Sequence, residues 1–386
     1  MTGVLWRRVL GVVLAPVLLT GLLAQPATAA AGIVGDIVRE PGAYEARFPD
    51  LLKLRDNRLL AVWHRATAHE EVLGTIRMSI GTANGRSWSE PVSALWPGTL
   101  GTVDTRDPKL ALMPDGRVML TFFVAGRGQV YYSMWTPGEA HFSPPKLIEV
   151  PDVEVGLLSH GSPLVLANRG SQVNQVLLPV YTVSESSAGH KAGAHFIRAT
   201  YLPGVNPALQ VASMHQMIAN GNPAGRWYGE PSFVQYGDQV VAVVRAEQAR
   251  PGVEARDPSP AIVVRWNPYT ATPQYSYQSF SDVLASSHHL LKTASGKLLF
   301  TYGDRSRTGR PTVGMMISNP TANWTKGKVV PIYNSGVYDQ ANPSSVEIAN
   351  GTFLTLGYNA KPKTGVGGDP TYGGTLWVVE SHATDY

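Results

Sequence analysis

Cysteine is absent from this chain of 386 residues, so no disulfide contributes to its stability. Charge of one sign is also scarce, because the formal net charge is +4 and falls to +2 once Arg7 and Arg8 are set aside. No run of lysine and arginine is present, which argues against a nucleic-acid partner. Beyond the N-terminal segment, no stretch approaches the roughly 20 apolar residues that a membrane span needs.

The N-terminal segment has the pattern of a secretory signal peptide. A short basic start, MTGVLWRR, precedes the apolar run VLGVVLAPVLLTGLLA and the small residues of QPATAAAG. We expect residues 1–30 to be removed, with cleavage between Ala29 and Ala31. A membrane anchor is the alternative, but the run contains Pro16 and is followed by cleavable small residues. The mature chain, residues 31–386, is therefore predicted to be secreted and free of membranes.

Glycine and proline are abundant, at 39 and 29 residues, and many short Val, Leu, Ile and Tyr runs lie between them. This composition indicates an all-β protein rich in turns. One unit recurs six times, as a polar start, an apolar strand, a turn and a second apolar strand. The copies begin at positions spaced 59, 54, 69, 58 and 55 residues apart, which are Arg47, Arg106, His160, Gly229, Ser287 and Asn342.

A third strand pattern and a more polar fourth segment follow most of these hairpins. Four strands per unit, repeated six times, predict a six-bladed β-propeller of four-stranded antiparallel blades. The last unit ends with only three strands, so we expect the segment near Ile33–Val38 to pair with Leu376–Val379 and close the ring. Residues 31–386 are interpreted as one propeller domain, and the chain is expected to be a monomer.

In a propeller, the head of strand one and the tail of strand two of each blade converge at one mouth. Glu230 and Arg245 bracket the fourth hairpin, so they should meet there. The corresponding positions of the other blades are also polar. The candidates for binding a substrate at this mouth are Arg47, Arg65, Arg106, Arg245, Arg305, Arg310, His64, His160, His288 and Asn342.

Two carboxyl groups beside a bound sugar can cleave a glycosidic bond, one as an acid and the other as a base or nucleophile. The candidates for this work are Glu230, Asp107, Asp339, Asp50 and Glu71, the last adjacent to Glu70. A zinc site would need further ligands that the sequence does not supply, and neither a nucleophilic cysteine nor a G-x-S-x-G turn is present. We predict no metal and no cofactor.

Several motifs resemble those of the sialidase superfamily of six-bladed propellers over essentially the whole mature chain. ARFPDLL is similar to the Arg-Ile-Pro motif, GEPSFVQYGDQVVAVVR to the hairpin with Glu and Arg, and TANGRSW at 82–88 to the Asp-box turn. The resemblance implies that Arg47, Arg245 and Arg310, with Arg305 as the rival third member, form a triad that holds a substrate carboxylate. It also implies that Glu230 assists a nucleophile.

The chain departs from that family at two positions. Asn342 stands where the family has its nucleophilic tyrosine, with Tyr338 four residues earlier as the substitute, and Glu70 or Glu71 replaces the acid/base aspartate. We therefore predict a secreted glycoside hydrolase acting on extracellular or cell-wall glycans. One alternative is an arabinan- or arabinofuranoside-type hydrolase that uses two carboxylates. The other is a propeller that binds carbohydrate without catalysis.

The charge of the substrate depends on what the arginines contact. Free arginines would favour an anionic ligand, because guanidinium groups match carboxylates in paired hydrogen bonds. If Asp107, Glu230 and Asp339 neutralise them internally, the site suits an uncharged furanose or hexose polymer.

Overall fold

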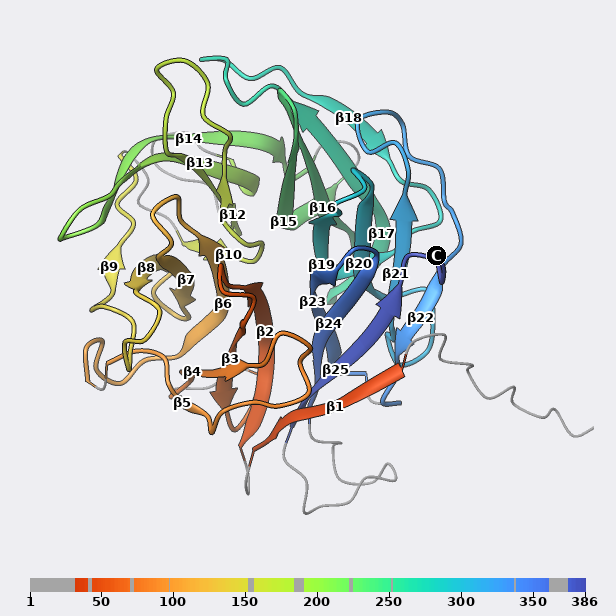
Figure 1. The fold of residues 1–386 in the computed structure, drawn as a ribbon. Coiled ribbons are helices and arrows are strands. Elements are labelled where there is room, and N and C mark those ends of the chain that lie inside the picture. Colours follow the sequence, from red (N-terminus) through yellow and green to blue (C-terminus); the bar gives the residue numbers. More distant parts are fainter. Residues whose placement is uncertain are drawn as a thin grey trace, which may run out of the picture.

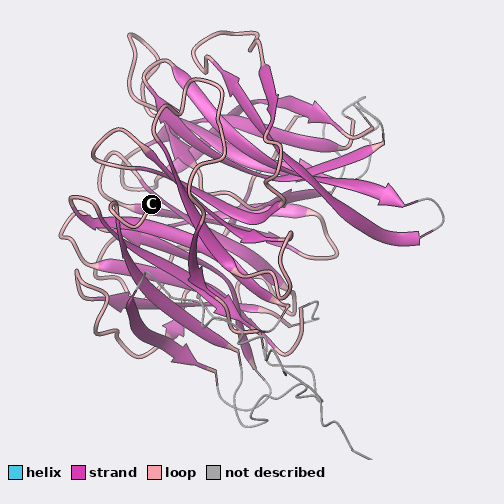
Figure 2. Ribbon diagram, turned by 90° about the vertical axis from the view of Figure 1, so that its right-hand side faces the viewer, coloured by secondary structure: helices cyan, strands magenta, loops and turns pink. Residues whose placement is uncertain are grey.

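The computed structural model describes residues 32–40, 44–69, 73–96, 98–151, 156–183, 191–221, 225–250, 253–336, 338–360 and 374–386. The predicted signal peptide, residues 1–30, lies outside these ranges, as do Glu70 and Glu71. The described residues form strands and loops, as the side view shows (Figure 2). No helix within them is long and apolar enough to cross a membrane.

Six antiparallel sheets of the described residues stand around a common centre as the blades of a propeller (Figure 1). Blade one contains β2 (Glu45–Lys53), β3 (Leu59–Ala66), β4 (Thr75–Gly81) and β5 (Val92–Ser93). Blade two contains β6 (Thr105–Leu112), β7 (Val118–Val124), β8 (Gln129–Trp135) and β9 (Lys146–Leu147). Blade three contains β10 (Leu157–Ser159), β11 (Leu164–Val165), β12 (Gln175–Thr182), β13 (Gly193–Leu202) and β14 (Ala208–Ala219).

The second half of the ring repeats this order. Blade four contains β15 (Arg226–Tyr236), β16 (Gln239–Arg250), β17 (Val253–Trp266) and β18 (Ser276–Ser279). Blade five contains β19 (Ala285–Lys292), β20 (Leu298–Asp304), β21 (Thr312–Ile317) and β22 (Val330–Tyr333). Blade six contains β23 (Gln340–Ala349), β24 (Thr352–Asn359), β25 (Thr375–His382) and β1 (Gly32–Arg39). The predicted six-bladed architecture is confirmed, with the innermost strand of blade three split into β10 and β11.

Apolar side chains fill the spaces between neighbouring blades. One cluster joins Val243 of blade four to Phe300 of blade five, and comparable clusters lie between the other pairs of neighbours. Strand β7 is buried along its whole length, because both faces of its sheet pack against another blade. This two-sided burial explains why the second strand of each repeat reads as a continuous apolar run.

The innermost strands share an irregularity at the end where they begin. In five blades, two residues of the first strand oppose one of the second, which is the pattern of a β-bulge. In each bulge one residue has a left-handed φ between 47° and 51°, and these residues are Phe48, Asp107, Glu230, Ser287 and Asn342. In blade three, the break between β10 and β11 falls at the same place.

Four of the five left-handed residues precede a proline, as in the pairs Asp107–Pro108 and Glu230–Pro231. Proline has no N–H group to donate, so it suits a point at which the ladder is already interrupted. A left-handed residue other than glycine costs roughly 1–3 kcal/mol and persists where the surrounding fold enforces it. The prolines of the repeat therefore mark the bulges, and we call this end of the ring the mouth.

The two ends of the chain meet in blade six, as predicted. Strand β1 lies along β25, with Ile33 opposite Val379 and Val38 opposite Leu376 (Figure 1). The pairing gives blade six its fourth strand and removes an exposed edge.

This pairing predicts that a disulfide forms in the variant Val38→Cys/Leu376→Cys. Opposite residues of an antiparallel pair have Cα atoms about 4.5–5.5 Å apart, which a disulfide can span. Because the native chain has no cysteine, thiol titration of the folded variant reads out this bond alone. The mismatched pair Val38→Cys/Glu380→Cys should keep two free thiols, and free thiols in the matched pair would contradict the register.

Candidate active site

The first ionic cluster at the mouth is centred on Asp339, which directly precedes β23 and contacts blades one, five and six. The Arg47 guanidinium donates to Asp339 and to Glu45, and its Nε lies 2.6 Å from Glu45 Oε2. Arg310 Nη2 lies 3.7 Å from Asp339 Oδ1. The Tyr358 hydroxyl donates to the same oxygen at 2.6 Å. Two arginines and two carboxylates thus neutralise one another.

The pKa of Asp339 lies below its ordinary value. Burial opposes ionisation, but a hydrogen bond from His69 and the charge of Arg47 outweigh it, with Tyr358 adding a further donor. Asp339 therefore carries its negative charge at neutral pH.

The second ionic cluster is centred on Arg245, which lies in β16 beside the bulge of β15. Arg245 donates from Nη1 to Glu230 and from Nη2 to Glu247 Oε1, the latter at 2.6 Å. Arg305 of blade five also donates to Glu247. The predicted meeting of Glu230 with Arg245 is confirmed by this contact. The second cluster likewise contains two arginines and two carboxylates.

The pKa of Glu230 is well below its ordinary value. Burial opposes ionisation, but the charge of Arg245 outweighs it, and the backbone N–H of Ser287 acts in the same direction. The Ser287 N–H lies 3.1 Å from Glu230 Oε2. Glu230 is therefore a carboxylate at every pH at which the protein is expected to work.

Asp107 differs from these carboxylates, because it makes no hydrogen bond or ion pair with any residue that the structure describes. Asp107 is only 9% exposed, and burial raises the pKa of its carboxyl group. Lys109 and Arg106 act against this rise, whereas the negative charge of Glu230 adds to it. Asp107 and Glu230 occupy equivalent bulge positions in blades two and four, with opposite shifts in pKa.

Blade three lies between them and contributes His160 and Tyr181. Burial lowers the pKa of His160 to about 3, so its imidazole is neutral. The His160 ring centroid lies 6.1 Å from that of His288, whose Nε2 donates to the Val243 carbonyl at 2.8 Å. Tyr181 contacts Trp227 edge to face at 5.9 Å between ring centroids. The two acids are thus separated by neutral and aromatic groups.

Four predicted site residues have contacts that favour a structural role. His64 Nε2 donates to Asp104 at 2.8 Å inside the protein, and Arg106 Nε lies 3.8 Å from the same carboxylate. Arg65 donates to Glu40 at 2.8 Å.

Asp50, the fourth of these residues, accepts hydrogen bonds from the Ser344 hydroxyl at 2.6 Å, the Leu110 N–H at 2.7 Å and the Ser162 hydroxyl at 3.0 Å. It therefore ties blade one to blades two, three and six in the interior of the ring.

Three further predicted residues lie near the Asp339 cluster or outside the described chain. Tyr338 is 60% exposed, and the Arg310 guanidinium lies 5.4 Å from its ring centroid. Asn342 is buried, and its Oδ1 has no hydrogen-bond partner among the described residues. Glu71 lies outside the described residues. Within them, no group of three or more His, Cys, Asp or Glu is arranged to hold a metal ion.

Sequence reasoning missed Glu45 and Glu247, the two carboxylates that complete the ionic clusters. Each stands two residues from an arginine, as Glu-x-Arg in β2 and Arg-x-Glu in β16. Because side chains alternate along a strand, residues two apart share a face. That spacing was the available signal.

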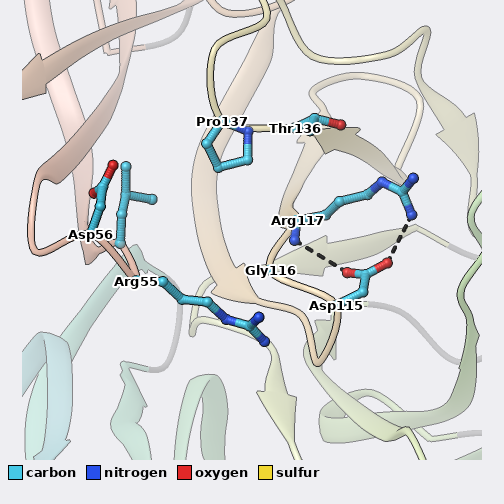
Figure 3. Close-up of a pocket in the computed structure, with 8 residues that line it drawn as sticks. Arg55, Asp56, Asp115, Gly116, Arg117, Thr136 and Pro137 are labelled. Carbon is cyan, nitrogen blue, oxygen red and sulfur yellow. Dashed lines mark hydrogen bonds and ion pairs between the residues drawn. The ribbon is translucent and has the colours of Figure 1, made fainter.

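A separate groove of about 390 Å³ lies at the opposite end of blades one and two (Figure 3). It is formed by the hairpin turns that carry Asp56 and Asp115, together with Arg55, Arg117 and Pro137. Asp115 pairs with Arg117 at 2.8 Å and accepts from Tyr201 at 2.6 Å. Asp115 and Arg117 thus neutralise each other. Because the groove lies away from the mouth, substitutions in it can serve as controls for substitutions at the mouth.

No family model matches the sequence, and a search of curated proteins found no match. Solved structures do match in fold. A Dyadobacter fermentans protein of unknown function is 15% identical, with a TM-score of 0.65 over 91% of this chain and 99% of that one. The Hadza microbial sialidase Hz136 is 14% identical, with a TM-score of 0.59 over 90% and 68%. The Penicillium chrysogenum α-L-arabinanase, complexed with arabinobiose, is 12% identical, with a TM-score of 0.59 over 92% and 99%.

The fold is that of the sialidase-like propellers. At these identities the likeness establishes the fold alone, and an arabinanase shares it with the sialidases.

The buried histidines predict a loss of stability in acid. Burial lowers the pKa of His288 from 6.5 to about 4. Between pH 6.5 and pH 4, this histidine therefore binds a proton in the unfolded chain but not in the folded chain. Stability should fall as pH drops from 6.5 toward 4, with a slope of at most about 1.4 kcal/mol per pH unit for this residue. Urea unfolding of His288→Gln, whose amide can still donate to Val243, should show a shallower slope.

The half-exposed His382 provides the matched control. His382→Gln should keep the wild-type dependence of stability on pH. The same dependence in His288→Gln would contradict the attribution of the acid destabilisation to His288.

Proposed function

We propose that the protein is a glycoside hydrolase in which Asp107 is the general acid and Glu230 is the ionised partner. The observation that carries this proposal is the opposite displacement of two pKa values at equivalent positions of blades two and four. Paired titratable groups whose surroundings drive their pKa values apart mark the acid and base of a hydrolytic site. The carbohydrate-directed enzymes among the fold neighbours support the same class of substrate.

The reaction follows from the two protonation states. The pKa of Asp107 is raised by burial, which favours the protonated carboxyl group, so this group can protonate the glycosidic oxygen as the bond breaks. Glu230 is held ionised by Arg245 and by the Ser287 N–H, so it can stabilise positive charge at the anomeric carbon. It then either activates water or attacks that carbon.

Aromatic and neutral groups of blades three and four suit a sugar ring. Tyr181 of blade three and Trp227 of blade four present an edge-to-face aromatic pair beside Glu230, and His160 is neutral. Arabinan-type hydrolysis is favoured over release of sialic acid, because the arginines at the mouth are already paired with carboxylates and Asn342 stands where sialidases carry their tyrosine.

Asp107→Asn and Glu230→Gln should each lower the release of reducing sugar by about 10²- to 10⁴-fold, the usual contribution of an acid or base. The assay screens arabinan, other neutral cell-wall polysaccharides and sialosides with the wild-type protein, and then tests the variants on the substrate found. Asp56→Asn, in the groove at the opposite end, should keep wild-type activity. Binding of glycan without turnover would indicate a carbohydrate-binding propeller in place of a hydrolase. Full activity of either variant would refute the catalytic role proposed for the substituted residue.

We further propose that the enzyme is exported and that residues 1–30 are removed. The support is the basic start, apolar run and small residues of the N-terminal segment. Expression of the full chain in a secreting bacterial host should yield an extracellular protein whose first residue, by Edman sequencing, is Ala30 or Ala31. An intact N-terminus in the membrane fraction would show an anchor instead.

A further inference from the structure

The Asp339 cluster has an arrangement that a purely structural ion pair does not need. The side chains of Arg47 and Arg310 are only 5% and 12% exposed, whereas that of Asp339 is 29% exposed. The two cations therefore lie behind the carboxylate, and the carboxylate faces outward. Three blades contribute one member each, so the arrangement depends on the closed ring.

The carboxylate is held in a fixed position. Tyr358 donates to Oδ1, and Arg47 and His69 contact Oδ2. The backbone at Arg310 is left-handed, with a φ of 48°, and Arg310 also donates to the Gln340 carbonyl next to Asp339. Asp339 thus satisfies a pair of guanidinium groups that would otherwise attract an anion from solution.

We propose that Asp339 determines substrate specificity by occupying, with its own carboxylate, the place beside Arg47 and Arg310 that the carboxylate of an acidic sugar would take. An approaching sugar acid meets a fixed negative charge and no free guanidinium, whereas an uncharged sugar meets no such repulsion. This inference rests on the proposed function insofar as it takes the ligand to be a sugar, and it narrows the substrates to uncharged glycans.

The charge balance of the neighbouring cluster supports the same conclusion. Glu230 and Glu247 neutralise Arg245 and Arg305 in the way that Glu45 and Asp339 neutralise Arg47 and Arg310. Among the four carboxylates of the two clusters, the side chain of Asp339 is the most exposed, at 29% against 7–13% for the others, so it is the residue whose removal opens an anion site.

The test is the binding of sugar acids to Asp339→Ala. Calorimetric titration at low salt uses glucuronic acid and N-acetylneuraminic acid as probes and glucose as the uncharged comparison. Asp339→Ala should bind the acids about 10- to 100-fold more tightly than the wild-type protein does, as expected for charge-assisted hydrogen bonds to two guanidinium groups. The gain should shrink with added salt, and glucose should show none.

Two controls isolate the cause. Asp56→Ala removes an exposed carboxylate paired with Arg58 at the opposite end of the ring, and it should bind the acids no better than wild type. Asp339→Ala/Arg310→Ala should lose the gain. No gain in the single variant, or a gain that survives loss of Arg310, would overturn the proposal and leave Asp339 as a purely structural partner of Arg47.

Stability provides a second readout if Asp339→Ala folds poorly. Sodium acetate should raise its midpoint of thermal unfolding more than sodium chloride at equal ionic strength, and the wild-type protein should show no such difference. An equal effect of both salts on the variant would overturn the proposal. These measurements need no catalysis, so they are independent of the activities of the Asp107 and Glu230 variants, which decide the hydrolase proposal.

Discussion

The bulge near the head of the innermost strand, present in five of the six blades, is the constraint on which the mouth depends. A regular ladder would keep these residues paired and would direct their side chains alternately into the two neighbouring blades. The extra residue interrupts the ladder and redirects its own side chain, and a proline follows it in four blades. The backbone cost of the left-handed residue is offset by the packing of the blades on either side. Asp107 and Glu230 reach the mouth for this reason.

Charge compensation is the second constraint. A buried ion is costly unless it is paired and hydrogen-bonded. Arg47 and Arg245 each contact two carboxylates, and Arg305 shares Glu247 with Arg245. Against this background, Asp107 is the exception among the described residues at the mouth. Burial raises the pKa of this carboxyl group and so favours its protonated form, which is the form that acid catalysis requires.

The repeat and its prolines were sufficient to predict the propeller, because each blade is built from contacts that are local in sequence. The contact between Glu230 and Arg245 was predictable for the same reason, since one hairpin joins them. The contact between Arg47 and Asp339 joins residues 292 positions apart and depends on closure of the ring. Asp50 was misplaced because a strand advances about 3.3 Å per residue, so three residues beyond Arg47 carry it about 10 Å from the mouth.

Resemblance to sialidases singled out the arginines but left their partners unknown, and the partners determine the charge of the mouth. Three free guanidinium groups would create a strongly positive mouth, whereas the same groups with internal carboxylates create a nearly neutral one. The fold does not determine whether the arginines are paired, because an arabinanase and sialidases share it. The charge of the mouth therefore depends on a few acidic residues at the ends of strands, which can change without altering the apolar contacts between the blades.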